Sequence, residues 1–237
     1  QKSDQGHFEK AYAKKQGLFH GQYMHFHPCG EVKGESFYLE GKLHGPSLFR
    51  SCAGNIVSSS WFYHGSIVGK SRQFYESGAL YSLQQYKKGK LHGKQQFFYE
   101  DQSPKTLLHY NDGRLEGGIE LYWPSGQVKR RAFYEEGLRK GADMLWNPEG
   151  ILLDISHYLK GHLSGVQQKR YPSGVLKEEL FYHEPNRFDR LVWNEQGLLE
   201  YEGRFIDHET FQETITQYPE GTKEVRKGIW DGKQVCF

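Results

Sequence analysis

The stretch YKKGKLHGKQQFFYE, residues 86–100, holds the pattern that decides the fold. Gly89 and Gly93 stand four residues apart around a leucine and a histidine, with aromatic residues on either side. Stepping by 24 residues in both directions from each of these glycines reaches another glycine every time within residues 17–165. At the average glycine frequency of about 7%, seven such coincidences in one column have a chance probability on the order of one in a hundred million. The stretch is therefore one copy of a 24-residue repeat.

Three glycine columns and one aromatic column share this step. The first glycine column is Gly17, Gly41, Gly65, Gly89, Gly113, Gly137 and Gly161, and the second is Gly21, Gly45, Gly69, Gly93, Gly117, Gly141 and Gly165. The third column reads Gly30, Gly54, Gly78, Gly126, Gly150 and Gly174, with Gln102 as its one exception. The aromatic column is Tyr38, Phe62, Tyr86, Tyr110, Tyr134, Tyr158 and Tyr182.

The repeat length predicts the secondary structure. Two strands of about seven residues and two turns of about five residues make one β-hairpin with its connection. Glycine supplies the positive φ that tight turns need, so the first two glycine columns are predicted to lie in turns. A helix is not expected where glycine recurs every few residues. The sequence therefore predicts an all-β fold, an elongated array of antiparallel β-hairpins with one hairpin per repeat. The turn that contains Gln102 is expected to differ in shape, with Pro104 setting its φ.

The ends of the chain depart from the repeat. Residues 17–182 hold seven regular repeats, whereas residues 183–237 lose the paired glycines and are predicted to be degenerate repeats that cap the array. Residues 1–16 are predicted to be a lead-in, either a short helix or a frayed segment. Because the chain begins with Gln1 rather than Met, both a cytoplasmic and an exported protein are compatible with it, with a signal peptide upstream in the second case.

Composition narrows the class of protein. Glycine accounts for 28 residues, aromatic residues for 15% and hydrophobic residues for only 36%, with a mean hydropathy of −0.80. These values suit short strands around a thin interior better than a thick apolar core. The net charge of +2 argues against a nucleic-acid-binding protein. No apolar run approaches the roughly 18 residues of a transmembrane helix.

Catalytic, cofactor and metal chemistry find little support in the sequence. A phosphate-binding loop needs a following helix and a lysine–hydroxyl pair, which the repeated glycine motif lacks. His20, His44 and His92 share one column, but equivalent positions of successive hairpins should lie about 10 Å apart, too far for one metal ion. The same spacing argues against a disulfide between Cys29 and Cys52. The sequence thus predicts a protein that is not an enzyme and has no cofactor or metal site.

The repeats resemble those of a known family. GKLHGP (41–46), GKLHGK (89–94) and GRLEGG (113–118), each followed by aromatic residues, are similar to MORN repeats. They are most similar to the 24-residue bacterial variant in proteins labelled YwqK-type antitoxins. The resemblance covers residues 17–182 well and residues 183–230 poorly. It implies an antiparallel hairpin array that is used for binding, with a toxin-neutralising or effector-type interaction as the expected role.

Aromatic residues in mixed columns are the candidates for a partner surface. A column that mixes aromatic and polar residues is typical of a partly solvated face, where Trp and Tyr are common anchors of a binding site. The alternative is that a thin sheet needs aromatic residues on both faces to exclude water. The candidate partner-binding residues are Trp61, Tyr75, Tyr99, Trp123, Phe133 and Tyr171. The expected partner is another protein; a surface for lipid headgroups or glycans, supported by Lys87, Lys88, Lys90 and Lys94, is the alternative.

Overall fold

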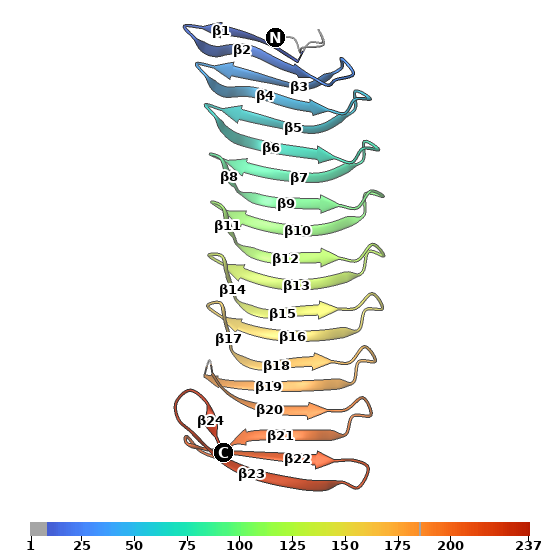
Figure 1. The fold of residues 1–237 in the computed structure, drawn as a ribbon, viewed down its shortest axis with the longest axis vertical. Helices are drawn as coiled ribbons and strands as arrows, with labels where there is room; N and C mark the ends of the chain where they lie inside the picture. The colour runs from blue at the N-terminus through green and yellow to red at the C-terminus, as the bar shows by residue number, and fades with distance from the viewer. Residues whose placement is uncertain (1–8, 185) are drawn as a thin grey trace. The chain divides into compact units, whose positions relative to one another are not determined.

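The computed structural model describes residues 9–184 and 186–237. The chain divides into two units, the first ending at Glu116 and the second beginning at Gly117. All regular elements of the described residues are β-strands, and the paired strands of each unit run antiparallel (Figure 1). The predicted all-β array of antiparallel hairpins is confirmed.

Unit 1 is one antiparallel ladder in chain order. Each hairpin pairs with the next, as when Tyr23 of β2 lies opposite Ser36 of β3 and Ser36 lies opposite Ser47 of β4. Its strands are β1 (Lys10–Lys15), β2 (Leu18–Phe26), β3 (Val32–Leu39), β4 (Lys42–Arg50), β5 (Ile56–Tyr63), β6 (Ser66–Phe74), β7 (Leu80–Lys87), β8 (Lys90–Leu91), β9 (Gly93–Phe98), β10 (Pro104–Asn111) and β11 (Arg114–Leu115).

Unit 2 repeats this arrangement and continues it beyond the regular repeats. The degenerate copies still pair strand by strand, as when Arg190 of β20 lies opposite Gly203 of β21. Its strands are β12 (Gly117–Tyr122), β13 (Val128–Glu135), β14 (Leu138–Arg139), β15 (Gly141–Trp146), β16 (Leu152–Leu159), β17 (His162–Leu163), β18 (Gly165–Arg170), β19 (Leu176–Glu184), β20 (Arg187–Trp193), β21 (Leu199–Phe205), β22 (Thr210–Gln217), β23 (Thr222–Trp230) and β24 (Val235–Cys236).

The start of the described chain is a strand rather than the short helix offered as one alternative for residues 1–16. β1 pairs with β2, and the rings of Tyr12 and Tyr23 stack with their centroids 5.8 Å apart. Strand pairing and ring stacking both reward an extended backbone here, and they override the helix-forming residues of the segment. Residues 1–8, which belong to the same prediction, lie outside the described residues.

The first glycine column lies in turns as predicted, whereas the second column does not, since Gly45 and Gly69 lie inside β4 and β6. There the positive φ belongs to an irregularity of the strand pairing rather than to a turn. Every glycine of the first two columns has positive φ, and the first of them follows a non-glycine residue that also has positive φ. Lys88 and Gly89, for example, have φ of 50° and 80°. Two successive residues of this kind form the type I′ turn that matches the twist of a hairpin.

The third glycine column closes a five-residue turn, and the prediction for Gln102 is wrong. In the regular copies the amide of the glycine donates to the carbonyl of the residue that opens the turn, as from Gly78 to Tyr75 at 2.9 Å. Gln102 makes the same bond to Tyr99 at 3.0 Å and takes a φ of 68°. The turn therefore keeps its shape, because the backbone bonds of the hairpin hold a non-glycine residue in the left-handed region.

The buried interior is largely polar. The buried residues lie along the middle of the face that carries the aromatic column of residues 38–182. This face is here called the tyrosine face. In unit 1 the hydroxyls of Ser36 and Ser47 lie 2.8 Å apart, and Gln95 is fully buried. In unit 2 the corresponding positions hold Ile119 and Asp143. Small or hydrogen-bonded side chains fill this central line, so the fold needs few large apolar residues there.

Candidate functional site

Three of the six candidate binding residues bridge neighbouring hairpins. Tyr75 Oη donates to the carbonyl of Phe98 at 2.8 Å, Trp123 Nε1 to that of Trp146 at 3.2 Å, and Tyr171 Oη to that of Trp193 at 3.0 Å. Each of them opens a five-residue turn and is half-buried. These hydrogen bonds thus link each turn to the turn of the neighbouring hairpin and stabilise the fold.

Tyr99 occupies the same column and is also half-buried. Lysine side chains cover three rings of the column: Lys105 Nζ lies 5.4 Å from the centre of Tyr99, Lys129 Nζ 4.3 Å from that of Trp123, and Lys177 Nζ 5.3 Å from that of Tyr171. Contacts of this kind are favourable cation–π interactions. The lysine stands six residues after the ring in each case, a spacing visible in the sequence that the prediction of exposed rings did not use.

The other two candidates, Trp61 and Phe133, are exposed. Trp61 of β5 is 53% exposed and Phe133 of β13 is 47% exposed. They share a repeat column with Phe37 and Phe181, which are 37% and 45% exposed. These four residues, here called the exposed aromatic column, lie on the face opposite the tyrosine face because side chains alternate along each strand.

The residues around the exposed aromatic column differ between the two units. In unit 1, Trp61 lies opposite Pro46 of β4 and Val68 of β6, which makes an apolar strip across three strands. In unit 2, the ring of Phe181 contacts that of His183 with centroids 4.9 Å apart. Charged groups near Phe133 are paired with each other, since Arg131 Nε donates to Glu120 Oε1 at 2.8 Å. The charged groups beside Phe133 thus neutralise each other.

An ion-paired cluster on the tyrosine face of unit 2 accounts for an exception in the repeat. Arg139 stands where other copies have an apolar residue, and its guanidinium lies 3.6 Å from Asp143 and donates to Tyr158 Oη at 2.7 Å. Arg130 donates two hydrogen bonds to the same carboxylate, of 2.8 and 2.5 Å. The hydrogen bond to Asp143 raises the pKa of Arg130. The Asp143 carboxylate thus lies between two guanidinium groups, an arrangement that fits a packing role.

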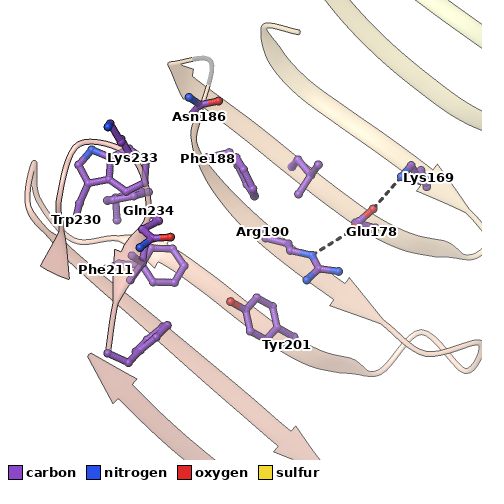
Figure 2. A pocket seen from close by; sticks show the side chains of 14 residues that line it. Lys169, Glu178, Asn186, Phe188, Arg190, Tyr201, Phe211, Trp230, Lys233 and Gln234 are labelled. Atoms are coloured by element: carbon purple, nitrogen blue, oxygen red, sulfur yellow. Dashed lines mark hydrogen bonds and ion pairs between the residues drawn. The ribbon is translucent and has the colours of Figure 1, made fainter. Parts of the chain in front are cut away.

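A cavity of about 580 Å³ lies at the end of unit 2 (Figure 2). The C-terminal segment with Trp230, Lys233 and Gln234 stands on one side of it, and side chains of β19, β20 and β21 form the other. Six of its fourteen lining residues are aromatic, and Glu178 lies 3.3 Å from Lys169 and 2.9 Å from Arg190. The prediction of a cap at residues 183–237 did not foresee a hollow there.

The titrating groups of this cavity are held in fixed protonation states. Burial raises the pKa of Glu178, but hydrogen bonds from Arg190 and Lys169 outweigh it, and the net pKa is lowered. Burial and a hydrogen bond to Glu213 raise the pKa of Tyr201 to about 12. At neutral pH the carboxylate is therefore charged and the phenol is neutral, so neither is poised to exchange a proton.

One histidine and two cysteines make contacts that the repeat pattern does not reveal. His44 Nδ1 is buried without a hydrogen-bond partner, and its ring instead packs against those of Tyr63 and His64. Cys29 and Cys52 are free thiols, so the structure holds no disulfide between them, but their Sγ atoms lie only 2.9 Å apart. The large separation on which the argument against a disulfide was based is therefore wrong. In the described ranges 9–184 and 186–237, no three His, Cys, Asp or Glu side chains are grouped to hold a metal ion.

Comparison with known proteins supports the repeat assignment. The family model described as "MORN repeat variant" matches residues 67–88 and 163–184. Both boundaries of the second match stand 96 residues after those of the first (163 minus 67, and 184 minus 88), which is four steps of 24. The two matches are thus in phase with the glycine columns. No curated protein matched the chain. The described part of the chain has no helix long and apolar enough to cross a membrane.

Proposed function

We propose that this chain is a non-enzymatic repeat scaffold that binds another protein through the exposed aromatic residues that each unit carries, Phe37 and Trp61 in unit 1 and Phe133 and Phe181 in unit 2. The observation that carries the proposal is the exposure of Phe37, Trp61, Phe133 and Phe181, between 37% and 53%, at one position of the repeat. Large rings on a rigid sheet bury much area at little cost in rotamer entropy, which is why they anchor protein interfaces.

The division of the six candidates sharpens this proposal. The polar atoms of three candidates donate hydrogen bonds to the neighbouring hairpin, so these side chains stabilise the sheet. They are Tyr75, Trp123 and Tyr171. Within the described residues the side chains of Trp61 and Phe133 form no hydrogen bond, and they lie exposed on β5 and β13. We therefore assign partner binding to Trp61 and Phe133, and stabilisation of the sheet to the three bridging residues.

A lipid-headgroup surface on the lysines of residues 87–94 has weaker support. Lys90 Nζ lies 2.9 Å from Asp112 Oδ2, so one of the four cations is already neutralised within the protein. Attraction to anionic lipid requires several unpaired cations close together.

The test is affinity capture from the native source with four baits. A partner that the parent chain captures should be recovered with the double variant Trp61→Ala/Phe133→Ala in an amount lower by a factor of about ten or more. Such a loss is expected when interface hot spots are removed. Ile206→Ala, which removes an equally exposed apolar side chain outside the column, should capture as the parent does. Tyr75→Phe, which removes only a bridging hydroxyl, should lower the melting temperature and leave capture unchanged. Unchanged capture by the double variant, or flotation of the parent chain with anionic liposomes at physiological salt in place of protein capture, would refute the proposal.

A further inference from the structure

Cys29 and Cys52 lie in successive five-residue turns of unit 1. The first turn closes with a bond of 2.8 Å from the His27 amide to the Glu31 carbonyl, and the second with a bond of 2.9 Å from Ser51 to Asn55. Cys29 is the third residue of its turn, whereas Cys52 is the second residue of its own. This offset lets the two side chains lean toward each other, and their Sγ atoms lie 2.9 Å apart.

A second contact holds the same two turns together. His27 Nε2 lies 2.8 Å from the carbonyl oxygen of Arg50, the residue before the second turn. This is the bridging bond that Tyr75 and Trp123 make elsewhere, and it fixes the distance between the turns independently of the sulfurs. Strands keep equivalent positions of successive hairpins about 10 Å apart, but turn side chains of adjacent hairpins meet between them.

We infer that Cys29 and Cys52 form a reversible disulfide that ties the turn of β2–β3 to the turn of β4–β5. Both thiols are free and exposed in the structure, so a small oxidant has access to them. Thiols already in contact need little backbone movement to join, which favours the bond over reaction with separate molecules. The inference does not depend on the proposed partner surface, which lies on strands rather than on these turns.

The reaction is an exchange with a low-molecular-weight disulfide. The Cys29 thiolate attacks one sulfur of the reagent, whose S–S bond breaks and releases one small thiol. The Cys52 thiolate then attacks the Cys29 sulfur of the mixed disulfide and releases the second small thiol. The two protein thiols lose two electrons and two protons, which the reagent gains. The hydrogen bond between the sulfurs lowers the pKa of Cys29 and raises that of Cys52, which is consistent with Cys29 attacking first.

The experiment exposes the reduced full chain to oxidised glutathione, alkylates the remaining thiols and digests the product with trypsin. We expect the peptides 16–33 and 51–70 to be recovered as one cross-linked pair, at least about tenfold in excess over chain that carries glutathione on both cysteines. The variant Cys236→Ser should give the same cross-link, because the third thiol takes no part. Cys52→Ser should instead accumulate glutathione on Cys29. Separate glutathionylation of Cys29 and Cys52 in the parent chain, without the cross-linked pair, would overturn the inference.

Discussion

Replacing Gln95 with methionine isolates the hydrogen bonds of the larger of the two fully buried side chains in unit 1. Gln95 is fully buried, and its Oε1 accepts from the Gln85 amide at 3.0 Å. Its Nε2 donates to the carbonyls of Gln85 at 3.0 Å and Gly93 at 3.2 Å. These bonds fill the break between β8 and β9, where the regular ladder is interrupted. Methionine has a similar length and shape, so it keeps the packing and removes all three bonds.

The expected loss follows from this count. Each hydrogen bond contributes about 1 kcal/mol net, so three bonds give a loss of about 3 kcal/mol in the free energy of unfolding. Urea unfolding followed by circular dichroism measures it, with the slope of the transition unchanged. Amide exchange at Gln85 provides a local reading and should become much faster. Gln167 makes the equivalent bonds to the amide and the carbonyl of His157 in unit 2, and its Nε2 also donates to the Ser164 carbonyl at 3.1 Å, so Gln167→Met should behave alike.

Gln96→Met is the matched control. Gln96 follows Gln95 in β9, points to the opposite face and is only half-buried, so its replacement should cost less than about 0.5 kcal/mol. If the Gln95 and Gln96 variants unfold at the same urea concentration and the Gln85 amide stays protected, the buried amide does not stabilise the hairpin.

Three further predictions test the turns, the ion-paired cluster and the C-terminal cavity. Gly89→Val should destabilise by more than about 1 kcal/mol because Gly89 has a φ of 80°, and an unchanged melting temperature would contradict the turn assignment. Asp143→Asn should cost about 2 kcal/mol in urea unfolding, since it weakens the paired bonds from Arg130, whereas Glu120→Gln at a more exposed pair should cost less than about 1 kcal/mol. Tyr201 has a folded pKa of about 12, above its ordinary value of 10, so its contribution is complete below pH 10 and is lost as the pH rises toward 12. Tyr201→Phe should remove that part of the alkaline decline in the urea midpoint, and an identical decline in both proteins would contradict the assignment.

The hairpins could be predicted from the sequence because a backbone position with positive φ favours one residue type, glycine. Gly89 and its equivalents mark a backbone conformation, and their step of 24 residues carries the period of the fold. The same reasoning failed at Gln102, where backbone hydrogen bonds impose that conformation on a residue other than glycine. Residue type therefore predicts a turn well when glycine is present and poorly when the surrounding bonds decide.

The candidate site was predicted less well because residue type does not reveal what a polar tip contacts. Trp61 and Trp123 look alike in sequence, yet one ring is exposed and the other donates to a backbone carbonyl. A carbonyl acceptor exists at every residue and leaves no trace in the pattern. The contact of Cys29 with Cys52 was missed for a related reason, since strand spacing does not describe side chains at offset positions of adjacent turns.

The polar central line of the tyrosine face has a consequence for how stability varies with temperature. The fully buried side chains are Gln95 and Ser82, and the buried hydrophobic residues among those described are Ile119, Ala132 and Phe211. Exposure of apolar surface raises the heat capacity on unfolding, whereas exposure of polar surface lowers it. We therefore expect a heat-capacity change below the usual value of about 12–15 cal/mol/K per residue. A smaller change flattens the stability curve, so this protein should lose stability slowly on cooling as well as on warming.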